Sequence, residues 1–257
     1  MTNPAAKSTT RRAVPRSGRA VVAHGEVALH AWTPLNDTAD ERSRAISRAT
    51  SRGLNVAIAA IGIVLAAPLM LIIAVLVKIS SPGPIIYTQT RVGIDRRGKN
   101  PGPAASRRKV NYGGRLFRIY KFRTMTENPH ATLQVWADPN DRRVTRVGGV
   151  LRKYRLDELP QLFNVLKGDM NVVGPRPEQP NLFISLREQI HGYPQRQRVL
   201  PGITGWAQVN QSYDRCIEDV KRKLAFDLEY IERQSPLTDI RILLRTIPVV
   251  LMKRGAW

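Results

Sequence analysis

The chain has 257 residues, of which 42% are hydrophobic, so it is long and apolar enough to bury a core and is not wholly disordered. Its 41 lysines and arginines against 20 acids give a formal net charge of +21, which favours anionic partners such as nucleic acid, anionic lipid or phosphorylated substrates. The single cysteine, Cys216, excludes an internal disulfide and fits a reducing compartment, and the 4 scattered histidines suggest no zinc motif.

The first 50 residues are polar and rich in Arg, Ala, Ser and Thr, with little apolar periodicity. This composition predicts a disordered basic arm over residues 1–50. A transit peptide shares the basic bias, but the acids Glu26, Asp37, Asp40 and Glu41 argue against that alternative.

A long apolar segment follows over residues 51–80. From Gly53 to Val77 no residue is charged, and a helix of that length extends about 37 Å, more than the roughly 30 Å of a bilayer core. Pro68 lies inside the segment and favours a kink there. Basic residues flank both ends, so both look cytoplasmic. These residues leave two interpretations open: a kinked spanning helix, and a re-entrant helix that bends at Pro68 and returns.

Residues 81–257 predict a catalytic domain with short strands and amphipathic helices. Strands are expected at "IIYTQTRV" (85–92) and "LFRIYKFRTM" (116–125), separated by a loop rich in Gly, Pro and basic residues. Helices are expected over 157–167, stopping near Gly168, and over two amphipathic stretches around 217–231 and 240–250. The fold class expected from these elements is α+β, mainly helical.

Two adjacent acids, Asp157 and Glu158, stand among the basic residues of "LRKYRLDELP". A helix that starts near Asp157 would make this residue an N-cap and Glu158 a first-turn acid, which would explain both. The alternative is catalytic, because adjacent carboxylates can hold Mg²⁺ or divide nucleophilic and supporting roles, while nearby cations hold phosphate oxygens. Such a set suits phosphoryl transfer, which needs no histidine.

Five stretches carry a resemblance to a known family: "KISSPGPIIYTQTRVG", "FRIYKFRTM", "RVTRVGGVLRKYRLDELPQLFNVLKGDMNVVGPRPE", "PGITGWAQVN" and "KLAFDLEYIERQSPLTDIRILLRT". They resemble the bacterial sugar transferase family, the monotopic polyprenyl-phosphate phosphoglycosyl transferases. The resemblance covers roughly residues 50–257. It implies an N-terminal re-entrant membrane helix broken at Pro68, followed by a cytosolic catalytic domain. The larger relatives carry additional spanning helices, so the small form is expected here.

The resemblance also implies an activity. Such enzymes transfer a sugar 1-phosphate from a UDP-sugar, here expected to be a hexose, to undecaprenyl phosphate and release UMP. They thereby initiate an exopolysaccharide, capsule or other lipid-linked glycan at the cytoplasmic face of the bacterial inner membrane.

The family motifs imply a role for each matching residue. Asp157 matches the nucleophile that forms an aspartyl-phosphosugar intermediate, and Glu158 matches its partner, associated with Mg²⁺. Arg176 matches the arginine that engages substrate phosphate, and Arg152 and Lys121 match further phosphate-binding residues.

Two departures from the family pattern and two rival functions complete the expectations. Ala67 stands where the family often has Ser before the proline, and Asn55 stands near the place of an acid.

A nucleic-acid-binding protein would explain the charge but not the uncharged segment, so no nucleic acid is expected. A non-catalytic membrane adaptor with the same fold is the alternative function. Anionic lipid is an expected partner, and a homodimer is left open.

Overall fold

The computed structural model describes residues 38–96, 112–126, 141–211, 214 and 216–252. The helices and strands below belong to the unit formed by residues 36–257. Residues 1–37 of the predicted arm and residues 97–111 of the loop after the first strand lie outside the described residues.

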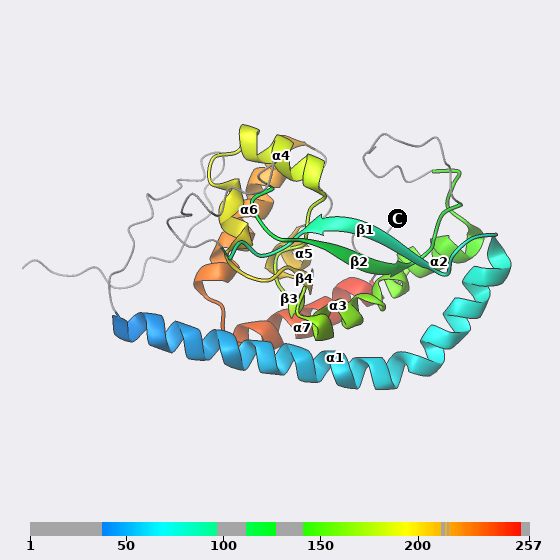
Figure 1. The fold of residues 1–257 in the computed structure, drawn as a ribbon, viewed down its shortest axis with the longest axis horizontal. Helices are drawn as coiled ribbons and strands as arrows, with labels where there is room; N and C mark the ends of the chain where they lie inside the picture. Colours follow the sequence, from blue (N-terminus) through cyan, green and yellow to red (C-terminus); the bar gives the residue numbers. More distant parts are fainter. Residues whose placement is uncertain (1–37, 97–111, 127–140, 212–213, 215, 253–257) are drawn as a thin grey trace, which may run out of the picture. The chain divides into compact units, whose positions relative to one another are not determined.

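The long N-terminal helix, α1, spans Thr38–Ser80 and contains Pro68. Figure 1 shows its axis turning along the cyan half. By length and composition, the part from Ala45 to Ser80 could cross a membrane, and most of it is not buried in the protein. The prediction of a disordered arm over residues 1–50 is wrong for residues 38–50, because these residues are helical. One reason is local, since Ala, Glu and Arg in "ADERSRAISRA" are good helix formers. A second is a tertiary contact, since Ser47 Oγ donates to Gln234 O at 3.3 Å.

After α1 the described residues form further strands and helices, some of which the sequence predicted (Figure 1). They are β1 (Ile86–Val92), β2 (Leu116–Phe122), α2 (Arg146–Lys153), the 3-10 helix η2 (Leu156–Glu158), α3 (Gln161–Lys167), β3 (Asn171–Val173), α4 (Pro180–Gln189), the 3-10 helix η3 (Tyr193–Arg198), β4 (Gly202–Thr204), α5 (Trp206–Asn210), α6 (Ile217–Glu232) and α7 (Pro236–Leu251). Helices dominate the described residues, which confirms the mainly helical α+β class. Both predicted strands and both C-terminal amphipathic helices are confirmed.

Two small sheets support the turn between α2 and α3. Strands β1 and β2 pair antiparallel, with Tyr87 opposite Lys121, and β3 pairs parallel with β4. Buried Asn164 of α3 ties the helix to β2, because its amide oxygen accepts from Tyr120 N at 3.0 Å and its amide nitrogen donates to Arg118 O at 2.7 Å. The Asn164 side chain thereby satisfies backbone groups of β2 that a neighbouring strand would otherwise pair with. It also holds β2, the strand that carries Lys121, against α3.

Asn55 fastens α1 to the rest of the domain. Its amide oxygen accepts from Val172 N at 2.7 Å and Val173 N at 3.0 Å, while its amide nitrogen donates to Asp239 Oδ2 at 3.1 Å. An acid at this position could accept from β3 but could not donate to Asp239. The departure seen in the sequence therefore replaces a charge with a buried amide that bridges α1, β3 and α7.

Candidate active site

The two adjacent acids lie in a tight turn rather than at the start of a long helix. Asp157 and Glu158 belong to η2 and are 7% and 6% exposed. Arg155, just before them, has φ 55°, a left-handed conformation that costs a non-glycine residue roughly 1 kcal/mol or more. The predicted helix over 157–167 is corrected, because α3 begins only at Gln161 with Pro160 as its N-cap. Capping of that helix therefore does not account for Asp157.

Glu158 is held by two cations. Lys121 Nζ donates to its Oε1 at 2.7 Å, and Arg176 Nη2 donates to the same oxygen at 2.7 Å. Burial alone would raise the pKa of the Glu158 carboxyl, but the charges of Arg176 and Lys121 outweigh burial and hold this pKa well below its usual range. Glu158 is therefore an ionised group that orients two cations at the site.

Asp157 has a different environment although it is the next residue. Lys121 Nζ lies 3.6 Å from its Oδ2, which is longer than a hydrogen bond. Burial raises the pKa of the Asp157 carboxyl, and the negative charge of Glu158 raises it further, against the opposing effect of Lys121. A carboxylate with a raised pKa is more basic and holds its electrons less tightly than an ordinary surface acid. The two acids therefore differ: Glu158 is bonded to two cations and charged, whereas Asp157 lies farther from Lys121 and has a raised pKa.

All five predicted site residues come together. The charges of Lys121, Arg176 and Arg152 each act on Asp157, and Arg152 is oriented by donating from Nε to Thr124 Oγ1 at 2.9 Å. These residues come from β2, α2, η2 and the loop after β3. Three cations around two carboxylates leave positive charge for the oxygens of a phosphate group.

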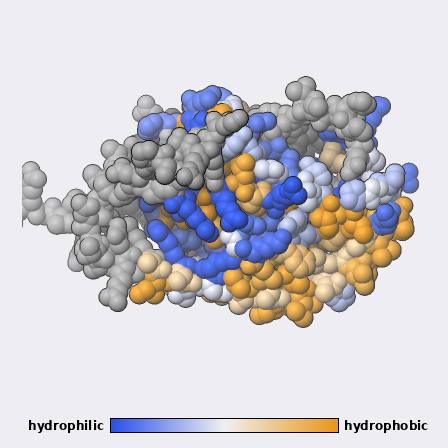
Figure 2. Space-filling model, in the orientation of Figure 1, coloured by the Kyte–Doolittle hydropathy of each residue, from blue (hydrophilic) through white to orange (hydrophobic). Residues whose placement is uncertain are grey.

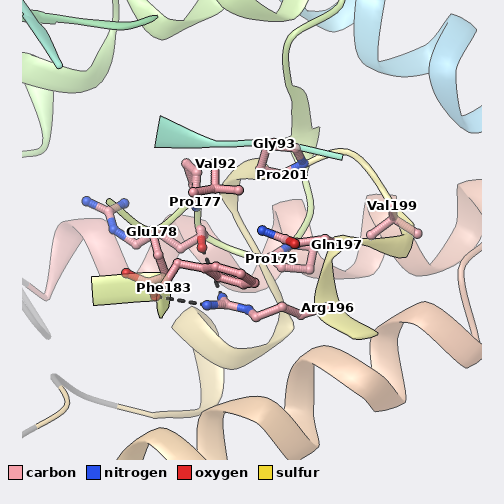
Figure 3. A pocket seen from close by; sticks show the side chains of 11 residues that line it. Val92, Gly93, Pro175, Pro177, Glu178, Phe183, Arg196, Gln197, Val199 and Pro201 are labelled. Carbon is pink, nitrogen blue, oxygen red and sulfur yellow. Dashed lines mark hydrogen bonds and ion pairs between the residues drawn. The ribbon is translucent and has the colours of Figure 1, made fainter. Parts of the chain in front are cut away.

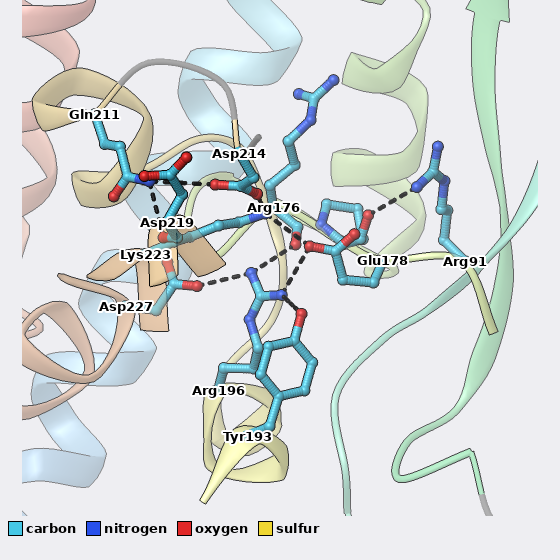
Figure 4. A network of polar contacts seen from close by, with 11 residues as sticks. Arg91, Arg176, Glu178, Tyr193, Arg196, Gln211, Asp214, Asp219, Lys223 and Asp227 are labelled. Atoms are coloured by element: carbon cyan, nitrogen blue, oxygen red, sulfur yellow. Dashed lines mark hydrogen bonds and ion pairs between the residues drawn. The ribbon is translucent and has the colours of Figure 1, made fainter. Parts of the chain in front are cut away.

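A buried ionic network that the sequence analysis missed lies behind Arg176 (Figure 4). Arg196, on η3, donates to Arg176 O at 2.9 Å and to Glu178 Oε1 at 2.9 Å, and forms an ion pair with Asp227 at 2.7 Å. Lys223, on α6, lies 2.8 Å from the same Glu178 oxygen. The network holds the loop 175–178 through Arg176 O and the Glu178 carboxylate, and so positions the Arg176 side chain. Only the tertiary structure joins these residues, since their charges resemble ordinary surface charges in the sequence.

The same loop closes over a small pocket (Figure 3). Glu178, Phe183, Arg196 and Gln197 line it together with Val92 at the end of β1 and the prolines of the loop. Arg91 also reaches the loop by donating to Pro177 O at 3.1 Å. Burial, together with the charge of Arg176, lowers the pKa of the Arg91 guanidinium to about 10. Arg91 is thus a further cation close to Arg176 that the sequence analysis did not single out.

We expect the ion pairs of Glu178 to make folding sensitive to acid. Burial alone would raise its pKa, but Lys223 and Arg196 outweigh burial and hold it well below the usual 4.5. A depressed folded-state pKa stabilises the protein above pH 4.5, and this stabilisation is lost as pH falls toward the folded-state value. The stability advantage of the wild type over Glu178→Gln should shrink by about 1.4 kcal/mol per pH unit in this range. Urea unfolding of both proteins at several acidic pH values measures this, and a pH-independent difference would contradict it.

Comparison with known proteins identifies one family. The family model described as "Bacterial sugar transferase" matches residues 46–253. A UDP-N-acetylgalactosamine-undecaprenyl-phosphate N-acetylgalactosaminephosphotransferase of Aeromonas hydrophila is 44% identical over 80% of the chain and 44% of its own length. A UDP-glucose:undecaprenyl-phosphate glucose-1-phosphate transferase of Escherichia coli is 38% identical over 87% of the chain and 44% of its own length. A protein of the same name from Caulobacter vibrioides is 38% identical over 80% of the chain and 71% of its own length. The chain thus spans less than half of the first two relatives.

Proposed function

Because the chain belongs to the bacterial sugar transferase family, we propose that it transfers a sugar 1-phosphate from a UDP-sugar to undecaprenyl phosphate and releases UMP. The relatives that share this domain bear names with these two substrates. The observation that carries the proposal is the pair Asp157 and Glu158 with Lys121, Arg152 and Arg176 around it. This set provides a nucleophile and positive charge for a diphosphate, as phosphoryl transfer requires.

In the first step, an Oδ atom of Asp157 attacks the phosphorus that bears the sugar. A bond forms between aspartate oxygen and phosphorus, the bond to the bridging oxygen of the diphosphate breaks, and UMP leaves with that electron pair. Arg176 and Lys121, both held by Glu158, lie where they can neutralise charge on the phosphoryl oxygens. Asp157 keeps the sugar phosphate as an acyl phosphate.

In the second step, a phosphate oxygen of the lipid attacks the same phosphorus. The bond to Asp157 breaks, the carboxylate is regenerated, and the product is a lipid diphosphate that carries the sugar. One site thereby handles a water-soluble donor and a membrane-bound acceptor in turn, which predicts ping-pong kinetics.

Mg²⁺ is the proposed metal. It binds in many enzymes through one or two carboxylates together with substrate phosphates, and not through an all-protein cage. The carboxylate of Glu158, which is kept ionised, fits this donor set. When bound, Mg²⁺ would neutralise charge on the diphosphate of the donor.

For the membrane segment we propose a re-entrant helix bent at Pro68. Ala59, in the first half of α1, packs in one core cluster with Phe117 and Val165. Ile73 and Val77, in the second half, pack in another with Phe122 and Leu151. Both halves therefore contact the same domain, whereas a spanning helix would carry its second half across the bilayer, away from that domain.

The apolar surface of α1 supports the same arrangement. Ile61, Val64, Leu65, Leu71 and Ile79 are each more than half exposed, and Figure 2 shows hydrophobic residues gathered along the face that α1 forms. Exposed apolar area of this extent marks a surface that contacts lipid or a partner. Since Arg123 also donates to Val77 O and Ser81 O at the end of α1, that end is held by the domain. We propose that the domain lies on the cytoplasmic face, where UDP-sugars are available, of the bacterial inner membrane.

The test of the proposed function is UMP release by the purified protein. With Mg²⁺ and a panel of UDP-sugars, we expect about one UMP per protein without acceptor and continuous turnover after undecaprenyl phosphate is added, the signature of a covalent intermediate. The sugar that gives the burst identifies the donor. If a folded, membrane-bound protein releases no UMP from any donor even with acceptor, the adaptor alternative replaces the enzyme.

A further inference from the structure

A mostly apolar pocket lies directly beside the catalytic turn. Its polar lining includes Arg155 and Glu158, which flank Asp157 in sequence. Its apolar lining comes from five elements (α3, β3, β4, α5 and α7) and the turn before α3: Leu159, Leu162, Val172, Ile203, Val209, Leu243, Val249 and Val250. The pocket therefore joins hydrocarbon-like walls to the carboxylate of Glu158, the residue next to Asp157.

Three further polar side chains, Thr204, Gln208 and Thr246, line the pocket. Gln208 Nε2 donates to Ile203 O at 2.9 Å, and its buried Oε1 has no hydrogen-bond partner among the described residues. The hydroxyls of Thr204 and Thr246 lie 2.9 Å apart and bond to each other, and Thr246 also donates to Ile242 O. Because these hydroxyls already have partners, they do not require a polar ligand in the pocket. An apolar ligand would lose little by lying against the two threonines, whereas Gln208 Oε1 is a polar atom of the wall that such a ligand does not satisfy.

The wall formed by α7 continues into an apolar surface. Leu244, Ile247 and Leu251 of that helix are 62%, 55% and 70% exposed, and Val249 and Val250 line the pocket between them in sequence. The helix does bury Ile242 completely, yet it also presents apolar residues outward, as a helix at a membrane surface does.

We infer that this pocket holds the first isoprene units of the lipid acceptor, with the acceptor phosphate beside Asp157. The inference rests on the proposed function and adds where the acceptor chain lies. Branched, unsaturated hydrocarbon is the ligand that apolar walls of Leu, Val and Ile side chains favour. The pocket adjoins the exposed face of α7, so a chain can pass from lipid into the pocket without crossing water. Arg155 adds positive charge at the pocket, where the lipid phosphate would enter.

The test separates the two half-reactions. In Val249→Trp, an indole ring enters the pocket, whereas Ile247→Trp places the same ring on the outer face of the same helix. We expect the acceptor KM to rise at least about tenfold in Val249→Trp, the factor that corresponds to losing burial of about two methylene groups. The acceptor-independent UMP burst should keep its wild-type size and donor dependence in both variants, and Ile247→Trp should keep the wild-type acceptor KM.

Two results would overturn the inference, and a third would refute the proposed function. Equal acceptor KM values in the two variants would mean that the chain lies elsewhere. A weakened UMP burst with an unchanged acceptor KM would mean that the donor's sugar occupies the pocket. A wild-type protein without any burst would instead refute the proposed function, which is a separate result.

Photo-crosslinking of the wild type gives a second measurement that needs no variant to fold. A polyprenyl phosphate with a photoreactive group in its first isoprene units, in detergent micelles, should label residues of α3 and α7 that line the pocket. Label confined to the outer face of α1 would contradict the inference whatever the kinetics of Val249→Trp.

Discussion

Replacement of Asp157 by Asn is expected to abolish both the UMP burst and turnover, with a loss on the order of 10⁴ to 10⁶ in rate, as when other covalent nucleophiles are removed. The amide has nearly the shape of the carboxylate but cannot form the acyl phosphate. UMP release measured by a coupled assay, with and without acceptor, checks both half-reactions. The burst matters most, because it reports the step before the lipid acts.

Stability should not fall in the same variant. Burial raises the pKa of Asp157, so the folded state disfavours its charged form at neutral pH. Asn carries no charge, and Asp157→Asn should therefore unfold at the same or a higher denaturant concentration than the wild type at pH 7, with the difference vanishing below the ordinary pKa of 3.8. The matched control is Asp169→Asn, which replaces an acid in the turn after α3 and should keep activity within about twofold. Turnover that survives in Asp157→Asn would refute the assignment of the nucleophile.

Replacement of Arg196 by Leu is expected to give the largest loss of stability, about 3–5 kcal/mol in the free energy of unfolding. The guanidinium is only 3% exposed and bonds to Glu178, Asp227 and Tyr193 as well as to Arg176 O. Removal of the cation leaves the Asp227 carboxylate, 2% exposed, without this partner, and leaves Glu178 with Lys223. The loop that carries Arg176 also loses its support, so the UMP burst should weaken together with stability.

The control for this variant is another arginine in an ion pair. Arg222 pairs with Asp219 at 3.1 Å on α6, but its side chain is 60% exposed. Arg222→Leu should cost less than about 1 kcal/mol, because solvent and salt screen exposed pairs. Urea unfolding of the detergent-solubilised variants, followed by circular dichroism, compares the two. Equal losses in the two variants would show that the network around Glu178 does not contribute as a buried network should.

Local sequence patterns foretold several elements of the domain. The β-branched and aromatic residues of "IIYTQTRV" predicted β1. Apolar residues at helical spacing predicted α6 and α7, because one face of each helix contributes to the core. Gly168 was expected to stop a helix, and it does so with φ 82°, a conformation that glycine adopts without strain. The boundaries were less accurate. The predicted start of α3 at Asp157 is wrong, since the chain makes a separate 3-10 turn before Pro160.

By itself, the sequence determined which residues to consider at the site, because Asp157 and Glu158 stand side by side among cations and the motifs around them resemble those of the family. The tertiary structure alone decided how these two acids differ. Lys121, 37 residues before Glu158, reaches it from β2, and Arg176, 18 residues after it, reaches it from the loop after β3. Burial and charge act through space, so the pKa values of two neighbouring carboxyls depend on partners that lie far away along the chain. The same holds for Arg196 and for the apolar pocket, whose walls meet only when α3, β3, β4, α5 and α7 pack together.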